Sequence, residues 1–480
     1  MKSLTSSILQ RFFIAVLALA LAGCEVGPDY QKPVTTVPPR WISDESQSQS
    51  AKAEIDQQWW ENFNDPVLTR LIAKAAAGNF DLKIAEARIA QARAGVSSAT
   101  AALLPTGDLK GAATREANQM ALPGGGTNPL ASSLHKPFNV FETGFDASWE
   151  LDIFGGNRRA KESAEADMQA SQASRDDVRV SLLAEVARTY VSIRQYQAQL
   201  ALARKTVAAD KKTLAIARQL FAVGQSPRLD VTQAEASLEQ AQTQIPQIRN
   251  LEAQAEYGMD VLLGEQPGAA RKIIGGDAPI PASDKKLALA APASVIAQRP
   301  DIRAAERKLA AATAQHGVAV AKFFPDISLS GFFGALNTSV SNLATPGNES
   351  WLANGSILLP ILNYGALSAN LDAADARQQE ARATYRKTVI AALSDVERSL
   401  TAYTEQEKFL HAAAAEVAQD ERSRAIAQNR FQAGLTSRLD VLQADRALYA
   451  AQDRLAQARA RASENLVALY KSLGGGWKKN

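Results

Sequence analysis

The sequence has little of the chemistry that enzymes and metal proteins need. It contains one cysteine, Cys24, and three histidines far apart in the chain, which excludes a disulfide framework and argues against a metal site built on cysteine and histidine. Basic residues (53) nearly balance acidic ones (50), so a nucleic-acid partner is not indicated. No G-x-S-x-G elbow or Walker loop is present. The composition therefore predicts neither an enzyme nor a cofactor.

Long apolar runs are also missing. The run at residues 12–21 is too short to span a bilayer, which needs about 20 residues. Basic residues precede it and small residues follow, so residues 1–23 are predicted to be an export signal peptide. The stretch Leu21–Cys24 resembles a bacterial lipobox, which implies cleavage before Cys24 and acylation of that cysteine; the alternative is a thiol placed there by chance. Glu25 follows, not an aspartate, and this favours sorting to the outer membrane.

An internal repeat sets the predicted architecture. Residues 221–235 read FAVGQSPRLDVTQAE, and residues 431–445 read FQAGLTSRLDVLQAD, an offset of 210. Upstream the offset is 220, as for Pro105 and Pro325. The first copy is therefore longer, and the extra residues are expected in the loop 118–137. Chance similarity of alanine-rich helices does not explain a shared Arg-Leu-Asp-Val at a helix break.

Each copy is predicted to contain the same elements in the same order. A helix comes first, two extended segments follow, and two long helices then form a hairpin. The predicted ranges are 65–103, 106–118, 138–154, 157–222 and 227–263 in the first copy, and 293–322, 326–338, 350–363, 365–432 and 437–473 in the second. The first long helix of each hairpin contains no proline and, at about 1.5 Å per residue, would be about 100 Å long.

The segment 138–154 alternates between apolar and acidic residues. Its apolar side carries Phe141, Phe145, Trp149 and Ile153, and its other side Glu142, Asp146, Glu150 and Asp152. This pattern fits a membrane β-barrel strand with lipid on one side and water on the other, and fits a half-buried strand of a soluble sheet equally well.

The number of predicted strands indicates an oligomer if the sheet is a barrel. Eight strands are about the smallest usual number for a transmembrane barrel, and an open edge in lipid costs several kcal/mol per unsatisfied backbone group. Two chains with four strands each would give a barrel filled by side chains, whereas three chains would give twelve strands and room for water. A trimer fits a channel.

Several dispersed motifs, in order, carry a resemblance to a known family. They are Trp59-Trp60 with Phe63 and Asp65-Pro66, Trp149-Glu150-Leu151-Asp152-Ile153-Phe154-Gly155, Arg299-Pro300-Asp301-Ile302-Arg303-Ala304-Ala305-Glu306, the two Arg-Leu-Asp-Val turns, and Leu473-Gly474-Gly475-Gly476-Trp477. In these the chain resembles the TolC-like outer membrane factors of tripartite efflux pumps, in particular their OprM/NodT-type lipoproteins.

The resemblance implies a mainly α-helical fold with a membrane β-barrel, assembled as a homotrimer. A twelve-stranded barrel would lie in the outer membrane and join a twelve-helix α-barrel that crosses the periplasm. The implied divisions are a signal peptide (1–23), a lipidated equatorial segment (24–64), repeat 1 (65–263), an equatorial linker (264–292), repeat 2 (293–473) and a C-terminal tail (474–480).

The resemblance also implies a function and partners. The chain would be the passive exit duct for drugs or other small molecules, working with a periplasmic adaptor protein and an inner-membrane transporter of the RND type. It would carry no catalytic residue, cofactor or metal. Its surroundings would be outer-membrane lipid, to which Cys24 would anchor it.

The tips of the two helical hairpins are the sites that the family pattern assigns to adaptor contact. At the first tip the residues are Val223, Gly224, Gln225, Ser226, Arg228, Leu229 and Asp230; at the second they are Gly434, Leu435, Thr436, Ser437, Arg438, Leu439 and Asp440. Ser226, Thr436 or Ser437 would cap the returning helix. Asp440, with Asp230, would form an acidic periplasmic gate. Gln443 stands where some relatives carry a second aspartate.

Other functions share this exit architecture. The duct would equally serve metal ions or type I protein secretion, although only four methionines argue weakly against a copper or silver route. A non-conducting structural envelope lipoprotein is the alternative outside transport.

Overall fold

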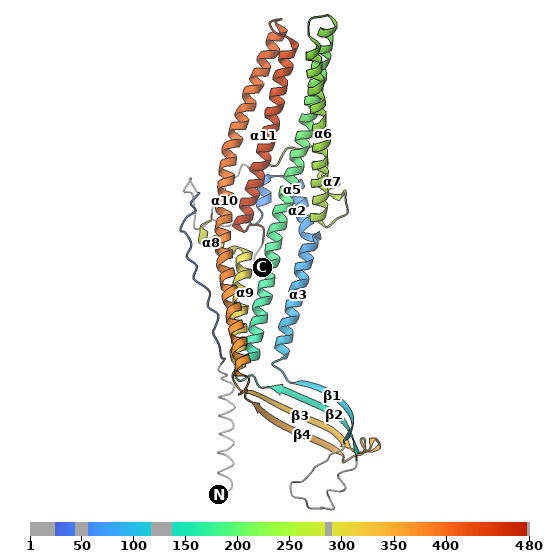
Figure 1. Cartoon of the computed structure of the whole chain (residues 1–480), viewed down its shortest axis with the longest axis vertical. Coiled ribbons are helices and arrows are strands. Elements are labelled where there is room, and N and C mark those ends of the chain that lie inside the picture. The colour runs from blue at the N-terminus through green and yellow to red at the C-terminus, as the bar shows by residue number, and fades with distance from the viewer. Residues whose placement is uncertain (1–24, 44–55, 117–136, 284–289, 478–480) are drawn as a thin grey trace, which may run out of the picture. The chain divides into compact units, whose positions relative to one another are not determined.

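The computed structural model of the chain describes residues 25–43, 56–116, 137–283 and 290–477 (Figure 1). The predicted signal peptide, Cys24 and most of the loop 118–137 lie outside these residues. The described residues are mainly helical, with two strand hairpins and two long helical hairpins, which confirms the predicted repeat of a strand hairpin followed by a long helical hairpin. No described helix combines the length and apolarity needed to cross a membrane.

The elements follow one another twice in the same order. The first copy contains η1 (Trp59–Phe63), α2 (Pro66–Gly78), α3 (Phe80–Ala101), β1 (Thr106–Glu116), β2 (Phe138–Glu150), α5 (Gly156–Ala222) and α6 (Arg228–Leu263). After α7 (Ala269–Ile274), the second contains α8 (Pro292–Gln298), α9 (Pro300–Ala321), β3 (Asp326–Asn337), η2 (Val340–Asn342), β4 (Glu349–Leu358), α10 (Tyr364–Gln432) and α11 (Arg438–Leu473). The hairpins α5–α6 and α10–α11 turn at the same end of the chain's helices (Figure 1).

The chain divides into two compact units. Unit 1 holds the described residues of 1–33, 89–170 and 306–384, and so contains the sheet. Unit 2 holds the described residues of 34–88, 171–305 and 385–480, and so contains the turns of both helical hairpins. Helices α3, α5, α9 and α10 contribute residues to both units.

The structure differs from the sequence prediction at the first helix of each repeat, which is two helices in both cases. Asn79 separates α2 from α3: its amide donates to the carbonyl of Leu262 (3.0 Å), and its side-chain oxygen accepts from the backbone of Asp81 (2.8 Å). Pro300 separates α8 from α9 because proline pushes the preceding Arg299 out of the helical region (ψ 128°). The predicted linker 264–292 also contains a short helix, α7.

Two strands, β2 and β4, end several residues earlier than predicted. β2 ends at Glu150, because Ile153 donates to the carbonyl of Leu151 (2.8 Å) in a tight turn that breaks the extended chain. β4 ends at Leu358, two residues before Pro360, which has no N–H to offer a neighbouring strand.

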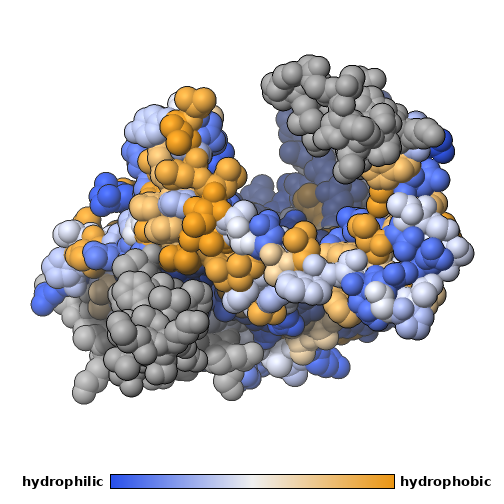
Figure 2. Space-filling model, turned by 90° about the horizontal axis from the view of Figure 1, so that it is seen from below, coloured by the Kyte–Doolittle hydropathy of each residue, from blue (hydrophilic) through white to orange (hydrophobic). Residues whose placement is uncertain are grey.

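The strands form one antiparallel sheet in the order β1-β2-β3-β4. The register aligns Leu109, Phe145, Phe333 and Trp351 in a row across all four strands. These side chains are 74%, 64%, 61% and 76% exposed. A row of large apolar side chains facing outward is unlike the surface of a sheet in water. Hydrophobic residues gather in contiguous patches when the molecule is seen from below (Figure 2).

The opposite face of the sheet is polar. Lys110 lies 3.3 Å from Glu142 and 3.7 Å from Asp146. Phe332, Leu336 and Leu352 are apolar exceptions on this face. The Phe332 ring lies 2.8 Å from where a Cβ would stand on either Gly144 or Gly334, which are paired across β2 and β3. The ring therefore fills the space left by the two glycines.

The core of unit 2 brings together residues from both ends of the chain. Trp59 is fully buried and stacks on Tyr470 with ring centroids 5.5 Å apart. A side chain on Gly475 would lie 3.0 Å from the Trp59 ring, so the glycine run after α11 permits this packing. Trp60, Phe63 and residues of α2 join the same cluster.

A buried polar network fastens the start of α2 to α5. The Asp65 carboxylate caps α2 through the backbone N–H groups of Val67 and Leu68, and it accepts a hydrogen bond from the Tyr190 hydroxyl (2.8 Å). Arg194, 2% exposed, donates to that hydroxyl (3.0 Å) and to the carbonyl of Gly276 (2.7 Å). Every group of this buried set is therefore paired, as a stable interior requires.

Tyr190 gives this network a testable pH dependence. Burial raises the pKa of Tyr190 to about 12. A raised folded-state pKa contributes stability that is complete below the unfolded pKa, about 10, and is lost as the pH rises toward 12. Tyr190→Phe should therefore lower stability at pH 8 by about 1 kcal/mol through the lost hydrogen bonds, and should make the decline between about pH 10 and 12 less steep.

Denaturant unfolding at a series of pH values measures both effects. Tyr196→Phe, on the same helix, is the matched control and should keep the steep decline. An identical pH dependence in Tyr190→Phe and the unmodified protein would contradict the buried phenol's contribution.

Candidate functional site: the tips of the helical hairpins

The first tip joins α5 to α6 by a tight turn. Gly224 has a φ of 72°, a conformation that glycine adopts without strain. The N–H of Gln225 donates to the carbonyl of Leu220 (2.9 Å), which closes the end of α5 in a Schellman-type turn.

The second tip repeats this geometry. Gly434 has a φ of 70°, and Leu435 donates to the carbonyl of Arg430 (2.9 Å). Nothing lies within 4 Å of the position that a Cβ would take on Gly224 or Gly434. Both glycines therefore present bare backbone at an open surface.

The start of α11 is held by a capping box. Ser437 is the N-cap; its hydroxyl accepts from the backbone of Asp440 (3.3 Å), and the Asp440 carboxylate accepts from the backbone of Ser437 (2.9 Å). The hydroxyls of Thr436 and Ser437 also donate to this carboxylate. These hydrogen bonds lower the pKa of Asp440, so the group is a fully ionised carboxylate at neutral pH.

The first tip lacks this box. Pro227, not Ser226, occupies the N-cap position of α6 and supplies no side-chain hydrogen bond. The expected capping role of Ser226 is therefore wrong, because proline takes the position. The Ser226 hydroxyl instead donates to the Asp230 carboxylate (2.5 Å).

Apolar side chains at both tips lie in the open. Val223, Leu229 and Leu435 are 68%, 61% and 70% exposed. The Arg438 guanidinium lies 5.4 Å from the centre of the Phe431 ring, which holds it against α10. The tips thus combine exposed apolar side chains, free backbone and charge, as protein-binding surfaces do.

The remaining predicted tip residues fall on the same two turns. Gln225, Arg228 and Asp230 are exposed at the first tip, while Leu439 is half-buried at the second. Asp230 and Asp440 stand on different hairpins, each bonded within its own tip. Gln443 is exposed one turn into α11.

Two ion pairs beside the tips were not predicted from the sequence. Arg446 of α11 pairs with Asp210 of α5, whose side chain is 3% exposed, and so joins the two hairpins. Arg424 of α10 pairs with Asp445 of α11 (2.6 Å). Such pairs depend on the register between helices, and no spacing within one helix reports it.

Solved structures with this arrangement are outer-membrane channels. The chain is similar to the outer-membrane channel OprN, with 31% identity, a TM-score of 0.85 and coverage of 95% of this chain and 100% of that one. It is also similar to the open state of the MtrE outer membrane channel of Neisseria gonorrhoeae, with 29% identity, a TM-score of 0.80 and coverage of 94% and 98%. The fold is thus that of a TolC-like outer-membrane channel.

The chain belongs to the outer membrane efflux protein family, whose model matches residues 71–265 and 291–475. Among curated relatives, it is 32% identical to the probable efflux pump outer membrane protein TtgC of Pseudomonas putida over 478 residues, covering 99% of this chain and 96% of TtgC. It is 31% identical to nodulation protein T of Rhizobium leguminosarum bv. trifolii over 468 residues, covering 97% of each. The chain is an outer-membrane efflux channel and not an enzyme, and it works as part of an efflux pump complex.

The difference between the tips gives a direct test. Ser437→Ala removes the N-cap hydroxyl and should weaken the first turn of α11 by about 1 kcal/mol. The amide of Asp440 should then exchange with solvent roughly fivefold faster, measured by hydrogen exchange with mass spectrometry. Ser226→Ala is the control, since Pro227 is the N-cap of α6. Equal exchange changes in the two variants would contradict the assignment of the capping box.

Proposed function

We propose that the chain assembles as a homotrimer whose twelve-stranded barrel spans the outer membrane and whose helical hairpins form a twelve-helix tunnel in the periplasm. The tunnel passively conducts drugs or other small molecules. They arrive from an inner-membrane transporter of the RND type through a periplasmic adaptor protein, and leave to the exterior.

The open sheet is the observation that carries this proposal. The four-stranded sheet has β1 and β4 at its edges. Within the described residues, each of these two strands pairs with another strand on one side only. An edge exposed to lipid costs several kcal/mol for each unpaired N–H or C=O. Three copies of a four-stranded sheet give twelve strands, enough to enclose water once every edge is paired.

The two faces of the sheet support the same orientation. The exposed apolar row from Leu109 to Trp351 suits contact with lipid tails. The face with Lys110, Glu142 and Asp146 suits a water-filled interior.

The hairpin tips are proposed as the adaptor contact and the gate. The bare backbone at Gly224 and Gly434 and the exposed Val223, Leu229 and Leu435 form the docking surface. The gate is assigned to Asp440, with Asp230, because three copies of an ionised carboxylate at a narrow entrance would repel one another and attract cations.

Acylation of Cys24 is proposed to anchor the chain in the outer membrane. The only cysteine follows a signal-like segment directly, and acyl chains together give a stable anchor.

Relatives indicate the cargo class. Three similar Pseudomonas putida proteins are named as components of efflux pumps for antibiotics, toluene and solvents. We propose small apolar or amphipathic molecules as the cargo of this chain as well.

The trimer is testable by mass and by conductance. Purified protein in detergent should have three times the chain mass, and planar bilayers that contain it should show single-channel currents. Mild acid or denaturant that separates the copies should abolish the threefold mass and the single-channel currents together. A folded monomer in detergent would overturn the proposal, as would a folded trimer that never conducts.

The gate is testable by separating charge from capping. Asp440→Ala should raise resting conductance severalfold and reduce block by divalent cations, because the ring of charge is lost. Ser437→Ala weakens the same cap but leaves the Asp440 carboxylate in place, so it is the matched control and should keep the low resting conductance. Equal conductance in Asp440→Ala and the unmodified channel would remove this residue from the gate.

A further inference from the structure

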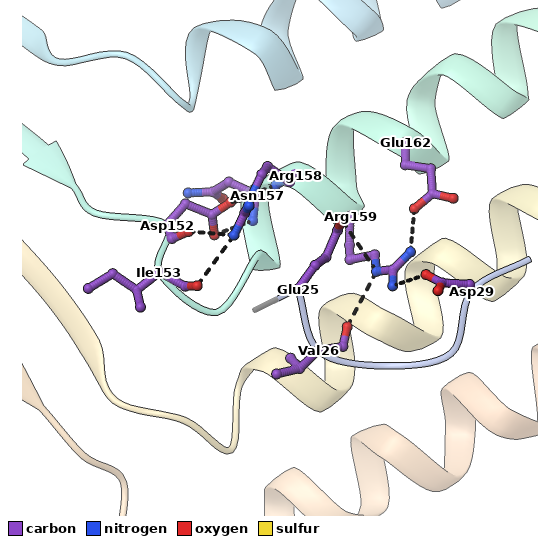
Figure 3. A network of polar contacts seen from close by, with 9 residues as sticks. All are labelled: Glu25, Val26, Asp29, Asp152, Ile153, Asn157, Arg158, Arg159 and Glu162. Atoms are coloured by element: carbon purple, nitrogen blue, oxygen red, sulfur yellow. Dashed lines mark hydrogen bonds and ion pairs between the residues drawn. The ribbon is translucent and has the colours of Figure 1, made fainter. Parts of the chain in front are cut away.

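The segment that follows Cys24 belongs to unit 1 and gathers around a buried arginine, Arg159 (Figure 3). We propose that residues Glu25–Lys32 form a docked strap and that Arg159, at the start of α5, is its positioning residue. The strap thereby holds Glu25, the residue that follows Cys24 in the sequence, beside the turn that joins β2 to α5. This inference rests on the proposed acylation of Cys24 for its functional meaning.

Arg159 depends on the strap for its partners. Its side chain is 4% exposed and lies 2.6 Å from the Asp29 carboxylate and 3.3 Å from that of Glu25. Its Nε also donates to the carbonyl of Val26 (3.3 Å). Glu162, 2.7 Å away, is the partner from its own helix. Removal of the strap would leave Arg159 with one carboxylate instead of three. This loss would lower stability, because a buried cation without partners is strongly destabilising.

The backbone of the strap fits against glycines. Gly27 has a φ of 93°, and a Cβ on it would stand 2.6 Å from the Cα of Gly317 in α9. A Cβ on Gly155 would stand 2.8 Å from the side chain of Glu25. The N–H of Val26 donates to the carbonyl of Phe154 (3.2 Å). The strap therefore lies in direct contact with α9 and with the turn after β2, where no larger residue fits.

The far end of the strap is fastened to α9. The Tyr30 hydroxyl donates to Glu306 (3.1 Å), and the Lys32 ammonium lies 3.1 Å from the same carboxylate. The Tyr30 ring packs against a cluster that includes Ala310 and is covered by the Arg307 guanidinium, 5.2 Å from its centre. The strap is thus held at both ends.

Docking changes where an acyl anchor can reach. The N–H of Val26 bonds to the carbonyl of Phe154, so the strap fixes Glu25, to which an acylated Cys24 would be joined, near the end of β2. A free segment from residue 25 to 33 would reach about 30 Å, which is the thickness of the hydrocarbon core. The strap turns a loose tether into a fixed attachment at the base of the sheet.

Hydrogen exchange with mass spectrometry on the full-length lipoprotein tests the docking. In the unmodified protein the Val26 amide should be protected. Arg159→Met should speed its exchange at least tenfold while peptides from β2 and β3 stay unchanged. Lys308→Met breaks an ion pair of unit 1 with Asp167 (2.8 Å) and leaves the strap alone, so it is the matched control. Unprotected amides across residues 26–32 in the unmodified protein, or unchanged exchange in Arg159→Met, would overturn the inference.

Variants on the strap guard against misfolding of the helices. Asp29 is largely exposed, and Asp29→Asn removes one partner of Arg159 without touching a helix. It should speed amide exchange in the strap. The exchange rate in Arg159→Lys should lie between those in Arg159→Met and in the unmodified protein. The acyl mass on the N-terminal peptide separates the two proposals. Protected strap amides without acyl groups on the N-terminal peptide would contradict the lipid anchor alone. Acyl groups on that peptide without protected strap amides would contradict the docked strap alone.

Discussion

The outer edges of β1 and β4, which have no strand partner among the described residues, are the constraint on which the rest of the structure depends. A sheet with an apolar row on one face and ions on the other belongs at a boundary between oil and water, where open edges are least tolerated. In the proposed trimer, pairing between copies would satisfy the edges without adding a residue to the chain. The sheet of one copy would then form a third of the barrel wall.

The helical hairpins also bury little apolar surface within one copy of the chain. Helices α5 and α10 have 67 and 69 residues, and their seams are narrow and rich in alanine, as in the cluster of Ala413, Ala451 and Ala458. Alanine allows close approach but buries little apolar area. Ion pairs such as that of Asp210 with Arg446 supply cross-links at chosen heights along the seam. Slender walls of this kind leave room for a wide passage inside an assembly.

Much of the fold was accessible from the sequence because it is repeated and periodic. The shared Arg-Leu-Asp-Val turns predicted two hairpins, and the alternation after Phe138 predicted the face that carries Phe145 and Trp149. The break at Asn79 escaped prediction because its signal is a side-chain bond to Leu262, 183 residues away. Phe332 escaped because its place over Gly144 depends on strand register.

The turns of the candidate site could be predicted from the sequence to a similar extent as the fold. Gly224 and Gly434 predict tight turns because glycine adopts a positive φ without strain. That Pro227 and not Ser226 is the N-cap of α6 is seen only in the structure. Only Glu162 is a local partner of Arg159; its other two carboxylates, those of Glu25 and Asp29, come from a segment that precedes β1 in the sequence. Residues whose role is set by distant partners are the ones that pattern alone leaves out.

The inequality of the two tips has a consequence for symmetry. One ends in Thr-Ser with a closed capping box, the other in Ser-Pro without one. Three copies would place six ends around the entrance in two alternating chemistries. Identical copies of an adaptor protein could not contact all six ends in the same way, so the proposed trimer would offer them two different kinds of contact.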